Sequence, residues 1–146
     1  MPFAICLALE PHVAAPVTSQ PAIPLSLLYL FTGLGGTNWA RQLNISDDDV
    51  EAASMRLTAE NLTLLAFRFG EDRLCPKARF DRLKEDFKEQ LEAHEYACHS
   101  FLRKCFAPRH SVLTEEYNIP QRYGLDPGSH AFERLCAFMR ERLTPG

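Results

Sequence analysis

The run Leu62–Phe69 constrains the fold more than any other segment of the chain. Its sequence, Leu-Thr-Leu-Leu-Ala-Phe-Arg-Phe, is almost continuously apolar. A strand with one face in water alternates apolar and polar residues, whereas a strand covered on both faces does not. The run therefore predicts a buried strand of a parallel sheet. This places the chain in the α/β class, with mostly parallel strands and flanking helices.

The residues after this strand support parallel pairing. Phe80, Leu83, Phe87 and Leu91 recur at helical spacing among charged residues, which predicts an amphipathic helix that covers the sheet. A short strand over about Glu92–Tyr96 is expected next. A helix that connects two strands of one sheet brings them into parallel orientation, so this unit indicates a strand-helix-strand crossover.

Two further helices are predicted from their starts and their apolar spacing. Ser46 followed by three aspartates is typical of a helix start, and predicts a helix from Asp47 to about Leu57. The segment Ser129–Leu143 carries apolar residues on one face behind a capping serine. Short apolar runs at Phe3–Leu9 and Leu25–Phe31 predict two more strands, and the proline-rich residues 10–24 and 103–128 predict loops.

Composition limits the class of protein. The chain has 146 residues, 46% hydrophobic, which is enough for one domain with a core, expected over 1–146. A net charge of −3 without a basic cluster argues against nucleic acid and anionic membranes as partners. The five cysteines have irregular spacing, and the first residues lack a basic leader, so we expect free thiols in the cytoplasm.

Asp72 and His99 are the candidate acid and base. Each lies three residues past the end of a predicted strand, and the ends of parallel strands meet at one edge of the sheet. An aspartate beside a histidine can orient the imidazole and stabilise its cation while the histidine acts as general base. Taken singly, a capping or solvated aspartate and a loop histidine explain the same residues.

Three segments resemble one family. Phe31–Gly35, Phe69–Asp72 and Cys98–Phe101 are similar to the glycine turn, the acid loop and the histidine loop of the dienelactone hydrolases, in the α/β-hydrolase superfamily. The resemblance covers about residues 27–143 and implies a partial α/β-hydrolase sheet and hydrolysis of small esters or lactones. It also implies that Asp72 is the triad acid and His99 the base. Cys98 departs from the family's glycine.

Cys6 is the candidate nucleophile that the resemblance implies. The family's nucleophile is a cysteine within Gly-x-Cys-x-Gly, whereas Ala4 and Ala8 flank Cys6 here. Those glycines serve a strained turn between strand and helix, so a buried structural cysteine is the alternative role. No chain upstream of Cys6 supplies the second oxyanion donor. We therefore expect a domain that lacks the N-terminal half of the fold.

Two functions remain open at this point. The first is a hydrolase without cofactor or metal, whose catalytic residues are His99, Asp72 and Cys6. The second is a non-catalytic remnant that binds a partner, or a second copy, through an exposed sheet edge. A zinc site is not expected, because the segment with Cys98, His99, Cys105 and His110 lacks a Cys-x-x-Cys pair. The glycines at 33–36 are not a dinucleotide fingerprint.

Overall fold

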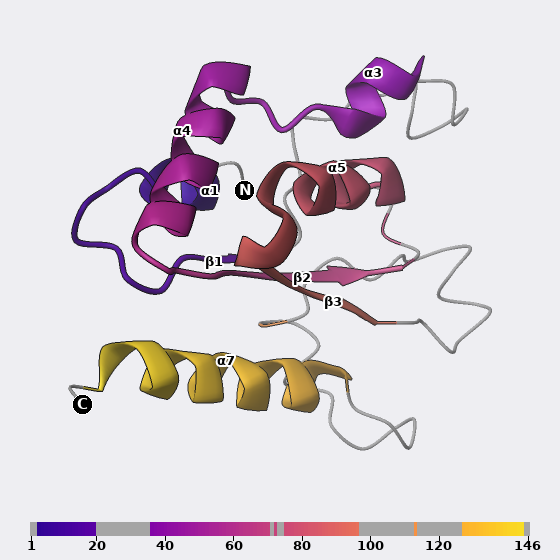
Figure 1. Ribbon diagram of the computed structural model, residues 1–146. Helices are drawn as coiled ribbons and strands as arrows, with labels where there is room; N and C mark the ends of the chain where they lie inside the picture. The colour runs from indigo at the N-terminus through magenta and orange to yellow at the C-terminus, as the bar shows by residue number, and fades with distance from the viewer. Residues whose placement is uncertain are drawn as a thin grey trace.

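The computed structural model of the protein describes residues 3–19, 36–70, 72, 75–96, 113 and 127–144. Helices and strands alternate along this part of the chain (Figure 1). Their order is α1 (Phe3–Leu7), β1 (Val17–Ser19), α3 (Gly36–Arg41), α4 (Asp47–Ala59), β2 (Leu64–Phe69), α5 (Lys77–Phe87), the 3-10 helix η1 (Lys88–Gln90), β3 (Leu91–Tyr96) and α7 (Pro127–Leu143).

The described strands form one three-stranded parallel sheet in the order β1-β2-β3. All six residues of the central strand β2 are buried. Its pairing with β3 runs from Leu64 opposite Leu91 to Phe69 opposite Tyr96. The predicted α/β class and parallel pairing are thus confirmed, and the strands predicted at Leu62–Phe69 and about Glu92–Tyr96 are present as β2 and β3.

Helices cover both faces of the sheet. Figure 1 shows α1, α3, α4 and α5 over one face and α7 over the other. Leu64 and Ala66 pack into the cluster under α4 and α5, and Leu65, Phe67 and Phe69 pack into the cluster over α7. Because successive strand residues point to opposite faces, this double coverage explains why β2 has no polar alternation.

Two predicted helices are confirmed with their physical causes. The Oγ of Ser46 accepts a hydrogen bond of 3.1 Å from the amide of Asp49, which caps α4 at its start. Phe80, Leu83 and Phe87 are fully buried on α5. The helical pattern stops before Leu91, which is the first residue of β3.

The predicted strand at Phe3–Leu9 is wrong, because this segment forms the helix α1. Ile5 and Ala8 are both fully buried, three residues apart, in the cluster under α4. That spacing belongs to one face of a helix, whereas two residues an odd number apart point to opposite faces of a strand. A short apolar run does not distinguish the two structures.

The loop predicted over residues 10–24 is also wrong in part, because it contains β1. The strand is only three residues long and follows Pro16, whose carbonyl accepts a 3.0 Å hydrogen bond from the amide of Leu65. Helix α7 begins at Pro127, so Ser129 lies inside it. The strand predicted at Leu25–Phe31 and most of the loop at 103–128 lie outside the described residues.

Arginine side chains connect segments that are distant in the sequence. Arg56 of α4 donates to the carbonyls of Ala8, Pro11 and Val13, at 2.6 to 3.2 Å. Arg142 of α7 donates to the carbonyl of Asn61 at 3.1 Å and to the hydroxyl of Thr63 at 2.6 Å. These contacts hold the segment between α1 and β1, and the turn before β2, in place.

Candidate functional site

Asp72 lies in a tight turn at the carboxyl end of the central strand. The amide of Gly70 donates to the carbonyl of Tyr96 at 2.8 Å, which extends the β2–β3 pairing by one residue. The amide of Asp72 then donates to the carbonyl of Phe69 at 3.1 Å and closes the turn. Asp72 is only 3% exposed. The predicted acid is therefore a buried carboxyl group at the edge where functional groups collect in parallel sheets.

Arg68 fixes this turn from the strand side. Its side chain is buried, and Nη2 donates to the carbonyl of Gly70 at 2.9 Å. Nη1 lies 2.9 Å from Oε2 of Glu95 on β3, which makes an ion pair. A buried guanidinium without a counter-charge is costly. The pair with Glu95 therefore ties the turn that carries Asp72 to the neighbouring strand.

Arg79 joins the start of α5, which follows this turn in the sequence, to the end of α3. It is fully buried in the first turn of α5, and Nε donates to the carbonyl of Gln42 at 2.7 Å. Nη2 donates to the carbonyl of Trp39 at 3.3 Å, and the guanidinium lies 5.3 Å from the centre of the Trp39 ring. Arg79 thus donates to carbonyls at and just beyond the end of α3, where the Trp39 carbonyl also accepts a 3.2 Å hydrogen bond from the amide of Gln42.

Cys75 is a member of this site that sequence analysis did not single out. It follows Asp72 by three residues and is fully buried. Burial, together with the charge of Asp72, raises the pKa of the thiol to about 12. A thiol acts as a nucleophile through its thiolate, so Cys75 is inert at neutral pH. It lies directly before Pro76, in the turn that leads to α5.

Cys6, the predicted nucleophile, is half-buried on α1. Helix α1 packs against α4 and β1. The nucleophile of an α/β-hydrolase sits in a sharp turn between a strand and a helix. Cys6 lies within a helix, so the local geometry differs from the expected turn. His99 lies outside the described residues, and the contacts of His99 with Asp72 and with Cys6 stay predictions.

A polar network joins β3 to α7. Glu92, His94 and Tyr96 alternate along β3, and their side chains meet Arg134 and His130 of α7. Arg134 donates to both carboxyl oxygens of Glu92, through Nε and, at 2.6 Å, through Nη2. His94 Nε2 lies 2.7 Å from Oε1 of Glu92, and the Tyr96 hydroxyl lies 3.0 Å from Nδ1 of His130.

This network has two consequences. Arg134, and after it His94, lowers the pKa of Glu92 to about 2, against desolvation that acts in the opposite direction. Burial, with the charge of Glu92, raises the pKa of Tyr96 to about 12. Tyr96 is the last residue of β3, and His130 lies in the first turn of α7. Their contact therefore joins the two ends of the segment that contains His99.

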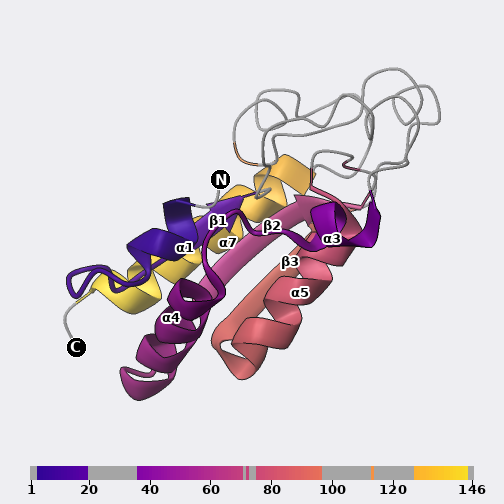
Figure 2. The same ribbon diagram turned by 90° about the horizontal axis from the view of Figure 1, so that it is seen from above.

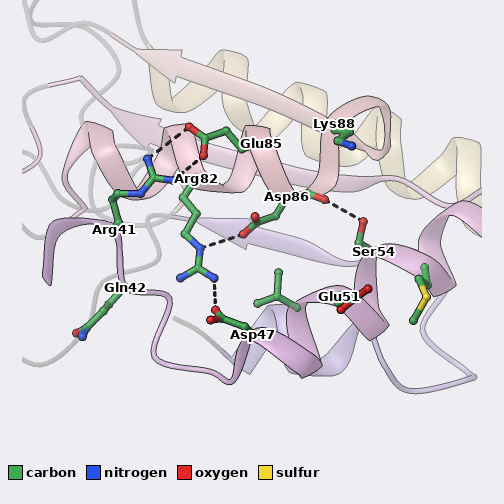
Figure 3. A pocket seen from close by; sticks show the side chains of 11 residues that line it. Arg41, Gln42, Asp47, Glu51, Ser54, Arg82, Glu85, Asp86 and Lys88 are labelled. Atoms are coloured by element: carbon green, nitrogen blue, oxygen red, sulfur yellow. Dashed lines mark hydrogen bonds and ion pairs between the residues drawn. The ribbon is translucent and has the colours of Figure 1, made fainter. Parts of the chain in front are cut away.

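A groove of about 880 Å³ lies between α3, α4 and α5 (Figure 3). Most of its charged groups already have partners: Arg41 pairs with Glu85 at 2.5 Å, and Arg82 pairs with Asp86 at 3.1 Å and with Asp47. Asp72 does not line this groove. Because opposite charges are paired within the groove, it does not show the single-sign field that attracts a charged ligand.

Comparison with known proteins returns no relative. No family model, no curated protein and no solved structure matches the chain. Within the described ranges, no helix is long and apolar enough to cross a membrane, and no three metal-binding side chains lie close enough to share an ion. The geometry around Asp72 is therefore the basis for assigning a function.

Proposed function

We propose that the chain is a dienelactone hydrolase-like domain that acts on carboxylic esters or lactones, with Asp72 as the acid and His99 as the base. One observation carries the proposal. Asp72 is buried in the turn after β2, and β2 pairs in parallel with β3 up to Phe69 and Tyr96. His99 follows Tyr96 by three residues. Both segments thus leave the same edge of the sheet from neighbouring strands.

The chemistry that this pair supports is acyl transfer. His99 would take the proton from a nucleophile as that group attacks the carbonyl of the ester or lactone, and Asp72 would stabilise the imidazolium. His99 would then return the proton to the leaving alkoxide. In the second half, His99 would activate water, which releases the acyl group as a carboxylic acid. The burial of Asp72 suits this role, because the carboxyl group is shielded from water and fixed by its turn.

A non-catalytic interaction module is the second candidate. The observation that favours it is the helical setting of Cys6, since a nucleophile in mid-helix lacks the exposed turn that an elbow provides. In that case Asp72 is a structural group, which fixes the turn between β2 and α5, and the chain acts through its surface.

Hydrolysis of 4-nitrophenyl acetate by the purified chain distinguishes the two functions. The variants are Asp72→Asn, His99→Ala and Cys6→Ala, with His12→Ala as the matched control because His12 is exposed on the segment between α1 and β1. For a hydrolase, we expect Asp72→Asn and His99→Ala each to lower turnover by about a hundredfold or more, while the control stays unchanged. Cys6→Ala shows whether Cys6 is the nucleophile.

Circular dichroism of each variant separates a lost fold from lost chemistry. A folded wild-type chain without turnover, or turnover that is unaffected in folded Asp72→Asn and His99→Ala variants, contradicts the hydrolase proposal. Either result leaves the interaction module as the function.

A further inference from the structure

Helix α7 carries an exposed apolar flank. Met139 and Leu143 are 38% and 56% exposed, and Phe132, two turns before Met139, is 38% exposed. Residues four and seven apart lie on one side of a helix, so the three side chains form a single stripe. We call them the α7 stripe. Ala131 and Phe138 of the same helix are buried against the sheet, so the stripe is distinct from the face that covers the core.

The direction of the α7 stripe follows from the contacts of the helix. Arg134 and His130 reach Glu92 and Tyr96 of β3. At 100° per residue, Phe132 and Met139 lie about 140° to 160° around the helix from Arg134. The stripe thus points away from β3, toward the side of β1. Figure 2 shows α7 beneath the sheet on this side, and β1 is the outermost strand there in the described chain.

Two charged residues border the stripe and have no partner in the described part of the chain. Glu133 and Arg140 are both exposed, and no salt bridge within the described residues involves either of them. They are seven residues apart, which is two turns of helix, so they lie on the same side. A negative group thus lies beside Phe132 and a positive group beside Met139.

We propose that α7 is a dimer interface and packs antiparallel against α7 of a second copy of this chain. The charges select this arrangement. In an antiparallel pair that sets Phe132 opposite Leu143, Glu133 lies within about 3 Å, along the axis, of Arg140 from the second copy. The two-fold axis creates this pair twice. In a parallel pair, the two-fold axis runs along the helices and puts the charged flanks of the two helices on opposite sides of the contact, so Glu133 and Arg140 gain no partner from the second copy.

Dimerisation through the α7 stripe would occur whether or not the chain is a hydrolase. It uses the exposed apolar area, which association removes from water, and a charge pattern that is complementary to itself. The apolar side chains supply the attraction, and the two ion pairs set the register and the direction. Binding to a different protein would not require the charges of α7 to be complementary to themselves, so the charge pattern favours a second copy of this chain.

Sedimentation equilibrium of the full chain tests the proposal. We expect a monomer–dimer equilibrium whose dissociation constant rises about tenfold or more in Glu133→Arg and in Arg140→Glu, because each change replaces two attractions with two repulsions. The double variant Glu133→Arg/Arg140→Glu restores the pair in reverse, and its dimerisation should return toward the wild-type value. Met139→Glu should abolish the dimer. Glu51→Arg, at an exposed position of α4, is the matched control and should have no effect.

Three results would overturn the proposal. These are a wild-type chain that stays monomeric at the highest soluble concentration, a dimer that is insensitive to the single charge reversals, and a double variant no better than the single ones. Glu133 and Arg140 are exposed and form no salt bridge with another described residue, so we expect the reversals to leave folding intact. Thermal unfolding of each variant verifies this.

Discussion

Replacing Glu92 with glutamine should destabilise the protein in a pH-dependent way. The bidentate contact with Arg134 lowers the pKa of Glu92 from 4.5 to about 2. At about 1.4 kcal/mol for each pKa unit, the upper limit for the stabilisation is about 3 kcal/mol. The side chain of Glu92 is 29% exposed, and solvent screening reduces the expected contribution to about 1 to 2 kcal/mol at pH 7.

The sign of the pH dependence follows from the direction of the pKa change. The folded state holds the charged carboxylate more strongly than the unfolded state does. The stabilisation is therefore fully present above the unfolded pKa of 4.5, and it is lost as the pH falls through the folded pKa of about 2. At pH 3 less than half of it remains.

Urea unfolding of wild type and Glu92→Gln at pH 7, 4 and 3 measures this effect. The difference in unfolding free energy should be about 1 to 2 kcal/mol at pH 7 and should shrink toward zero in acid. Glu141→Gln is the control, since Glu141 contacts the same arginine but is 56% exposed, and should cost less. A difference that stays constant from pH 7 to pH 3 would refute the electrostatic argument and assign the effect to packing.

Two further predictions concern buried groups. Because the pKa of Cys75 is about 12, its thiolate fraction at pH 8 is about a thousandfold below that of an ordinary cysteine. Iodoacetamide should therefore label Cys75 in urea but not in the native protein, as measured by mass spectrometry of its peptide. Rapid labelling of the native protein would disprove this. Arg56→Met leaves three carbonyls without their donor, so it should lower the free energy of unfolding in urea by about 1 to 3 kcal/mol and speed proteolysis between α1 and β1. Arg82→Met removes contacts with the side chains of Asp47 and Asp86 only and should lower the free energy of unfolding less. Equal effects of the two arginine changes would contradict this.

The parts of the fold that were predictable are those whose residues carry a local signal. Ser46 with its three aspartates marks the start of α4, and the unbroken run up to Phe69 marks a strand covered on both faces. The position of Asp72 at the edge of the sheet follows from the end of that strand. These features depend on sequence neighbours, so sequence patterns capture them.

The parts that were missed depend on distant contacts. Helix α1 has the same apolar composition as a strand, and only its contact with α4 decides which face is buried. β1 has three residues after a proline, and its pairing with β2 defines it. The full burial of Cys75 is a tertiary property of the segment between β2 and α5, which sequence spacing does not encode. Helix α3 likewise depends on Arg79, which lies 37 residues beyond Gln42.

Because of the arginine contacts, the fold should tolerate substitutions in its connecting segments better than insertions or deletions there. Arg56, Arg79 and Arg142 all donate to main-chain carbonyls, which every amino acid provides. Side chains in the receiving segments, at Pro11 or Gln42, can therefore be exchanged without removing the acceptor, whereas Asn61, with a φ of 50°, favours asparagine or glycine. An insertion or a deletion in those segments moves the carbonyl itself and breaks the contact. A redesign of this scaffold thus has freedom in the composition of its connecting segments and very little in their length.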